Sequence, residues 1–238
     1  MSHVTLLLKK CLRLGFAAFV FVLAFVPGAC EAQGSKPTDD AFAQLLSKAQ
    51  AGDTLAQHDL AYRYKMGTGV PQDYAEAGKW YRKAAEQGDA DSQLNLGMMY
   101  QNGFGVQKDQ REAAKWYESA AEQGNAVAEF FLGGIYERGE GVTRDYQRAA
   151  QWYEKAADQG DTGSMFALGV MYEHGRGVPQ DFTTAYMWFN LWQASDPKFS
   201  SPFLKMRSDR DELGKMMTPE QIAEGQRLTR EWLAKHPK

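Results

Sequence analysis

Apolar side chains recur with a helical spacing along residues 53–196, and the whole pattern returns every 36 residues. In the first copy Ala56, Leu60 and Tyr64 are four residues apart and form one stripe of a helix. A second stripe follows, in which Trp80 stands among small alanines. A fixed period of tens of residues indicates stacked repeats, so we predict four copies of a two-helix unit. Their bounds are 53–88, 89–124, 125–160 and 161–196.

Glycines mark the turns of each copy. Gly-x-Gly-Val follows the first helix, and Gly-Asp or Gly-Asn precedes the next copy. Glycine reaches the positive φ values that reverse a chain, and Asp or Asn caps the following helix. Asp73 and Glu76 also have the spacing of a capping box at the start of the second helix. A further glycine costs stability inside the first helix, so we predict close helix contacts at Gly97, Gly133 and Gly169.

The segments on either side of the repeats predict capping helices. Residues 33–52 are expected to form a short linker and an N-terminal helix, Asp39 to Gln50. Residues 197–238 predict a C-terminal cap of two helices, near Pro202–Lys215 and Pro219–Lys235. The second of these helices opens with Thr-Pro-Glu-Gln, which is a strong start signal.

Residues 1–32 have the pattern of a secretory signal peptide. Three basic residues precede an apolar run, residues 14–26, that is shorter than the ~20 residues of a membrane-spanning helix. Small residues follow, and we expect cleavage after Ala32 and a periplasmic or secreted protein. Two alternatives stay open, an uncleaved anchor and lipidation of Cys30 as in bacterial lipoproteins. Pro27 stands where such lipoproteins usually carry Leu or Val.

Composition limits the partners and the chemistry. Without residues 1–32 the chain has 24 basic residues (27 − 3) and 29 acidic residues (30 − 1), so a nucleic-acid partner is not expected. Contact with a membrane is expected only through the signal peptide or a lipid on Cys30. Both cysteines, Cys11 and Cys30, precede the repeats, which excludes a disulfide framework there. We expect no cofactor and no metal.

The second copy carries the complete pattern: Ser92-Gln93-x-x-Leu96-Gly97-x-x-Tyr100, Gly103-x-Gly105-Val106, Asp109, Ala113, Trp116-Tyr117, Ala120-Ala121 and Gln123-Gly124. This set resembles the Sel1-like repeat, a relative of the tetratricopeptide repeat. The resemblance implies an all-α fold, a right-handed α-solenoid of stacked antiparallel helix pairs. It also implies a scaffold that binds proteins or peptides through a concave face, in signalling, envelope assembly or host interaction. Family members proposed to act on β-lactams carry paired cysteines in each repeat, and this chain has none there.

No residue pattern points to catalysis, so we predict that the chain is not an enzyme. The Gly-x-Gly-Val loops follow helices and lack the Gly-Lys-Ser/Thr ending of a phosphate-binding loop. His58 and His174 lie in different copies, and the recurring aspartates are explained as caps. The aromatic series recurs in every copy, which favours a place in the core over a ligand platform. A cell-wall or carbohydrate-binding module stays open as an alternative, and an enzyme acting on β-lactams or peptidoglycan is a less favoured one.

Positions of the first helix that vary between copies are the candidates for partner contact, because the concave surface of a solenoid tends to carry recognition. One varying series, His58, Leu94, Phe130 and Phe166, is expected to lie between repeats. The other series are expected to line the concave surface. The predicted contact residues are Tyr62, Met66, Met98, Asn102, Arg138, Val170 and His174.

Overall fold

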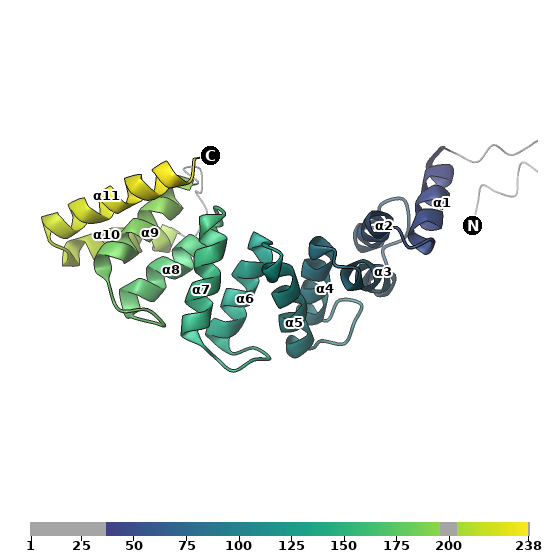
Figure 1. The fold of residues 1–238 in the computed structure, drawn as a ribbon, viewed down its shortest axis with the longest axis horizontal. Coiled ribbons are helices and arrows are strands. Elements are labelled where there is room, and N and C mark those ends of the chain that lie inside the picture. The colour runs from purple at the N-terminus through teal and green to yellow at the C-terminus, as the bar shows by residue number, and fades with distance from the viewer. Residues whose placement is uncertain (1–36, 196–203, 238) are drawn as a thin grey trace, which may run out of the picture. The chain divides into compact units, whose positions relative to one another are not determined.

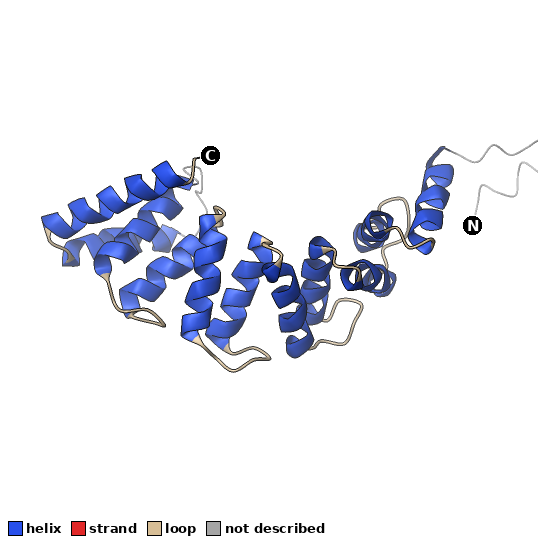
Figure 2. Ribbon diagram, in the orientation of Figure 1, coloured by secondary structure: helices blue, strands red, loops and turns tan. Residues whose placement is uncertain are grey.

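The computed structural model describes residues 37–195 and 204–237. The predicted signal peptide, Cys11, Cys30 and most of the predicted linker lie outside the described residues. Within them the chain forms eleven α-helices and no strand (Figure 2). The helices are α1 (Pro37–Gln50), α2 (Thr54–Met66), α3 (Tyr74–Glu86), α4 (Ala90–Asn102), α5 (Gln110–Glu122), α6 (Ala126–Arg138), α7 (Tyr146–Asp158), α8 (Thr162–His174), α9 (Phe182–Ser195), α10 (Leu204–Met216) and α11 (Pro219–Lys235).

Each repeat contributes one antiparallel helix pair, and successive pairs lie side by side (Figure 1). We call α2, α4, α6 and α8 the A helices and α3, α5, α7 and α9 the B helices. The helix α1 packs on α2, and α11 packs on α9. The predicted α-solenoid of stacked helix pairs is therefore confirmed, and one described helix packs against each end of the array. The expected helix Pro219–Lys235 has the bounds of α11, whereas the other two expected helices differ from α1 and α10 by one or two residues at an end.

The apolar stripes found in the sequence form the core between the helices. The A-helix leucines Leu60, Leu96, Leu132 and Leu168 are fully buried. The B-helix tryptophans divide into two groups. Trp80 and Trp188 are buried, whereas Trp116 and Trp152 are half-buried, so the expectation of a purely internal tryptophan series holds for only two of the four positions.

The glycine after the A-helix leucine sits where an aromatic ring of the B helix crosses it. A Cβ atom built on Gly133 would lie 2.7 Å from ring atoms of Tyr153, and one on Gly169 would lie 2.5 Å from Phe189. Such distances are shorter than carbon–carbon contact allows. The predicted close approach is thus confirmed, and these glycines permit it because they have no side chain.

The Gly-x-Gly-Val loops of the second, third and fourth repeats pack against the repeat before them. Gly103 ends α4 in a left-handed conformation, with φ of 77°. Gly105 lies against the first residue of the preceding B helix, since a Cβ built there would be 2.1 Å from the Tyr74 carbonyl oxygen. The turn chemistry predicted from the sequence therefore also packs neighbouring repeats together.

Side-chain caps begin the helices as predicted. Asp73 accepts hydrogen bonds from the backbone N–H groups of Ala75 and Glu76 at 2.8 and 3.0 Å. The Asp73 backbone N–H donates to the Tyr64 carbonyl at 2.9 Å and the Glu76 carboxylate pairs with Lys79 at 2.5 Å, so the expected capping box does not form there. At the start of α11, Thr218 and Gln221 do form both hydrogen bonds of a capping box.

A buried hydrogen-bonded ladder links consecutive repeats. Gln57 donates to the Ala49 carbonyl at 3.1 Å and accepts from Gln87 of the next junction at 2.7 Å. The second repeat reproduces both bonds at the same distances. In the third repeat Glu129 takes the glutamine position and accepts from Gln159 at 2.7 Å. In the fourth, Met165 and Ser195 occupy the two positions.

Candidate protein-binding surface

Three large apolar side chains of α2 point away from the core. Leu55 is 73% exposed, Tyr62 49% and Met66 54%. They are seven and four residues apart, so they follow one side of the helix. The opposite side of the same helix, which carries Ala56 and Leu60, is buried. Thus α2 is apolar on both sides, and only one of them is covered by the described residues.

The predicted contact residues of the second repeat are less open. Met98 is half-buried and packs against the core cluster of the middle repeats. Asn102 is exposed, but its amide donates to the Met98 carbonyl at 2.8 Å. One turn before Met98, Asn95 donates to the Asp91 carbonyl at 2.8 Å and accepts from Lys65 at 2.7 Å. The side-chain amides of this surface are therefore already bonded within the chain.

The third repeat presents a folded-back cation. The Arg138 guanidinium pairs with Glu140 at 2.7 Å, and this hydrogen bond raises the arginine pKa above its usual value. The same side chain lies over Gly134, because a Cβ built on that glycine would be 2.8 Å from an Arg138 nitrogen. Arg138 is thus exposed as predicted, but its charge is locally balanced.

The fourth repeat is covered by the chain itself. Val170 is half-buried and packs against a cluster that contains Phe189, Leu213 and Met217. His174 is exposed, and its Nδ1 lies 3.0 Å from the Val170 carbonyl. The structure therefore does not gather the seven predicted residues into one open surface. Tyr62 and Met66 remain its most exposed apolar members.

The second varying series contacts the B helix of its own repeat and, at two positions, the next repeat as expected. Phe130 packs against Tyr153 of its own repeat and lies against Gly163 of the next, whereas the ring contact of Phe166 with Phe189 is within the fourth repeat. His58 reaches across to the next repeat, where its Nδ1 is 3.1 Å from Asp89 and 3.0 Å from Ser92. A hydrolytic triad needs the serine and the carboxylate on opposite ring nitrogens, whereas both contact Nδ1 here. This contact ties two repeats together.

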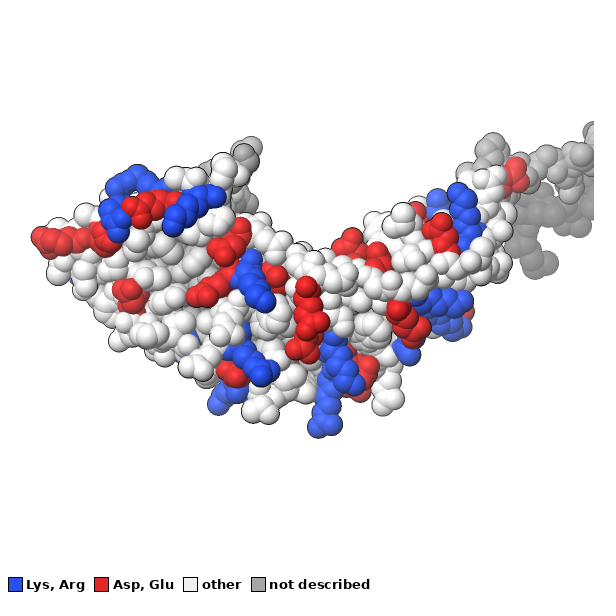
Figure 3. Space-filling view, in the orientation of Figure 1, with Lys and Arg blue, Asp and Glu red and all other residues white. Residues whose placement is uncertain are grey.

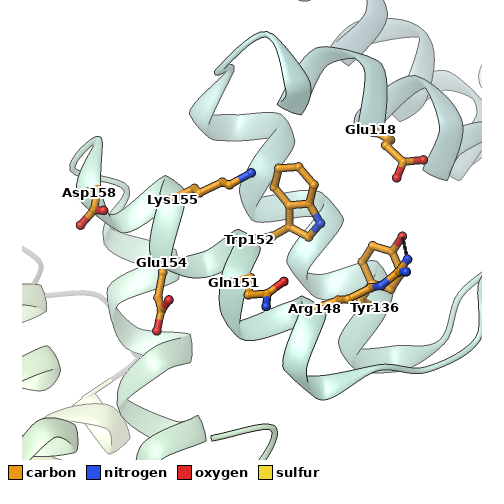
Figure 4. Close-up of a pocket in the computed structure, with 8 residues that line it drawn as sticks. All are labelled: Glu118, Tyr136, Arg148, Gln151, Trp152, Glu154, Lys155 and Asp158. Carbon is orange, nitrogen blue, oxygen red and sulfur yellow. Dashed lines mark hydrogen bonds between the residues drawn. The ribbon is translucent and has the colours of Figure 1, made fainter.

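A groove on the B-helix side was not anticipated from the sequence. It has a volume of about 540 Å³ and is lined by residues of α5, α6 and α7 (Figure 4). Lys155 lies 3.9 Å from the ring centre of Trp152, and Arg148 lies 5.4 Å from that of Tyr136. Both aromatic rings thus already contact a cation of the same chain. One sign of this groove is present in the sequence. At one position of the repeat the residue is Arg82 in the first copy but Glu118 and Glu154 in the second and third.

The carboxylates of this groove differ in environment. Burial, with a smaller contribution from Asp158, raises the pKa of Glu154, while donation from Tyr172 opposes the rise. Acidic and basic side chains are interspersed over the visible face (Figure 3). Among the described residues no group of three or more His, Cys, Asp or Glu could hold a metal ion. No described helix is long and apolar enough to cross a bilayer.

Comparison with known proteins bears on the family. The Sel1 repeat family matches residues 54–89, 90–125, 126–161 and 162–192. A crystal structure of c5321, described as a protective antigen of uropathogenic Escherichia coli with this repeat fold, is 33% identical with a TM-score of 0.73. A Sel1 repeat protein from Oxalobacter formigenes is 37% identical with a TM-score of 0.62. Comparison with curated proteins gives no match.

The two similar structures match this chain over only part of their own length. The likeness covers 86% of this chain but 43% of the E. coli chain, and 65% of this chain but 64% of the O. formigenes chain. This chain therefore spans less than two thirds of either similar structure. The family assignment itself rests on four consecutive matched repeats, which cover more than half of the sequence. The chain belongs to the Sel1 repeat family.

Proposed function

We propose that this chain is an exported scaffold that binds a protein or peptide through the concave face of its A helices, centred on the exposed line of Leu55, Tyr62 and Met66. That line carries the proposal, because large exposed apolar side chains that share one side of a helix, here with the exposed Asp59 between Leu55 and Tyr62, mark interaction sites. Aromatic and methionine side chains are also enriched where proteins meet. Sel1 repeats are generally non-catalytic scaffolds for protein interaction, which supports the same function.

Site-specific photo-crosslinking tests the surface. A photoreactive residue at position 62 should give a discrete protein adduct in cells, and the same residue at position 104 should not. Phe104 is a matched control, since it is 52% exposed but lies on a loop after α4. Equal labelling from both positions, or no adduct from position 62, would contradict the proposal.

Export is a separate part of the proposal and rests on residues 1–32. The similar E. coli chain is described as a protective antigen, which supports an exported protein. Cell fractionation and mass spectrometry of the mature N-terminus test this part. A chain beginning at Gln33 is expected in the periplasm or medium. A lipid on Cys30 would identify the anchored form, and an uncleaved cytoplasmic chain would exclude export.

A further inference from the structure

A polar pocket lies where α10 and α11 both pack on α9. It has a volume of about 360 Å³, within the size range of small-molecule sites. One alanine is the only apolar residue of its described lining, and none of the lining residues is acidic. The polar lining residues come from all three helices and are Asn190, Gln193, Arg210, Gln226, Thr229 and Arg230.

The charge of Arg230 is not balanced by another described residue. Its side chain is exposed and has no hydrogen-bond or ion-pair partner in that part of the chain. The acidic residues nearest to it on α11, Glu224 and Glu231, both pair with Arg227. Neither stands three or four residues from Arg230, the spacing at which side chains of one helix meet. Arg230 therefore brings a full positive charge and its N–H donors to the pocket.

The other arginine of the pocket orients an amide beside it. The Arg210 guanidinium donates to the side-chain oxygen of Gln193 and pairs with Asp211 at 2.6 Å. Because the Gln193 oxygen accepts this bond, the amide N–H groups of Gln193 remain as donors. Two arginines against one aspartate leave one positive charge at the pocket, together with amide donors that need acceptors.

The end of α9 opposes an anion only weakly. Asn190 and Gln193 belong to the last turns of α9, and a helix C-terminus carries about half of a negative elementary charge. The full charge of Arg230 exceeds this value. A cationic ligand would be repelled by Arg230, and an uncharged ligand would leave its charge unbalanced. The pocket therefore favours an anion that supplies hydrogen-bond acceptors.

We infer that this pocket binds a small molecule through a carboxylate or phosphate group, which accepts hydrogen bonds from Arg230 and from the amide of Gln193. A guanidinium can donate two parallel N–H groups to one such group. The pocket is separate from the surface proposed on α2, so either proposal can fail while the other stands.

An NMR titration of the mature chain with isotope-labelled amides tests this site. Inorganic phosphate and malonate are the probes, and malonamide, which resembles malonate but is uncharged, is the control. The ionic strength is held constant because salt screens exposed charges. Phosphate or malonate should give saturable shifts at the side-chain amides of Gln193 and Gln226, and malonamide should not. The anion that binds more tightly identifies the group that the pocket prefers.

Variants of two arginines on α11 assign the binding to Arg230. Arg230→Gln should weaken binding about tenfold or more, because a hydrogen bond to a charged group is lost. Arg230→Lys should keep part of the affinity, since it retains the charge but not the planar fork. Arg227→Gln is the matched control and should bind as the parent does, because the charge of Arg227 is already paired.

Three results would overturn the inference: shifts that spread over the whole surface without saturating or are absent, unchanged affinity in Arg230→Gln, and an equal response to malonamide. Arg230 has no described partner to lose, so its variants should fold as the parent does. Circular dichroism of each variant checks this expectation.

Discussion

At the scale of single residues, the crossing glycines control how closely the helices approach. Gly133→Ala places a methyl group 2.7 Å from the Tyr153 ring, and both are buried. Overpacking of this kind costs about 1–3 kcal/mol, so the variant should unfold at lower denaturant concentration. Gly214→Ala is the control, because its nearest neighbour is a Tyr186 atom at 3.8 Å. Helix propensity should make that variant neutral or more stable. Equal losses in both variants would contradict the packing argument.

A second residue-scale prediction concerns Glu129, which is 3% exposed. Burial raises its pKa, while donation from Gln159 opposes the rise. The folded chain therefore holds the proton more tightly than the unfolded one, and stability falls as pH rises through the folded-state pKa. Glutamine at this position makes two hydrogen bonds in the first and second repeats. Glu129→Gln should thus restore the ladder and remove this pH dependence.

Denaturant titrations at two pH values measure this effect. Near about pH 4, where an exposed glutamate is largely protonated, the parent and Glu129→Gln should have similar free energies of unfolding. Near about pH 7.5 the variant should be more stable by about 1 kcal/mol, the usual contribution of one hydrogen bond. A variant that is less stable than the parent at the higher pH would show that the buried carboxylate is required.

Single residues were predictable where the repeat itself carried the information. The approach at Gly133 followed from three glycines at one register. The prediction of a capping box at Glu76 was wrong because the Asp73 backbone N–H donates to the carbonyl of Tyr64, in the preceding helix, and not to the Glu76 carboxylate. The cover over Val170 could not be predicted, since it comes from a C-terminal segment outside the repeat pattern.

At the scale of elements, the loops between A and B helices act as joints between repeats. Gly105 has φ of 69°, and an added Cβ would lie 2.1 Å from the Tyr74 carbonyl oxygen. Gly105→Ala should therefore cost more than the 1–2 kcal/mol of a left-handed alanine alone. Gly69→Ala separates the two effects. It has φ of 77°, but its nearest neighbour is an Arg63 atom at 3.8 Å.

Thermal unfolding followed by circular dichroism compares the two variants. Gly69→Ala should lower the melting temperature by only the conformational cost, and Gly105→Ala should lower it further. Equal melting temperatures would mean that the loop does not pack on the preceding helix.

The order and type of the helices could be read from the sequence, because caps and turn glycines recur. The partial exposure of Trp152 could not be read from the sequence, because the position of its ring against Lys155 depends on the neighbouring helices.

At the scale of the whole molecule, stability should vary along the array, because each repeat contacts only its neighbours. Leu60 and Leu132 are both buried, but one lies in the first repeat and the other in the third. Each change to alanine should cost about 2–5 kcal/mol locally. Leu132→Ala should lower hydrogen-exchange protection across α4 to α9. Loss after Leu60→Ala should stay within α1 to α5, since the first repeat contacts α1 and the second repeat.

Hydrogen exchange followed by mass spectrometry distinguishes these patterns. Uniform loss of protection over all described helices in both variants would indicate one cooperative unit in place of coupled repeats.

The stacked architecture was predictable from the 36-residue period. The partner surface was only partly predictable, because equivalent positions of the A helices have different surroundings in each repeat, from open at Tyr62 to covered at Val170.

The ladder from Gln57 to Gln159 also bears on how such a protein can change its length. In each of the first three repeats a glutamine at the end of the B helix donates to the side chain at the position of Gln57, thirty residues earlier. A duplicated block of 36 residues would therefore bring the same donor and the same acceptor with it. A copy of the first or second repeat would keep both hydrogen bonds of its glutamine, whereas a copy of the third would add a second buried carboxylate. In the fourth repeat the rung is weaker, because the Ser195 hydroxyl donates to the Met165 sulfur at 3.7 Å and no amide or carboxylate takes part.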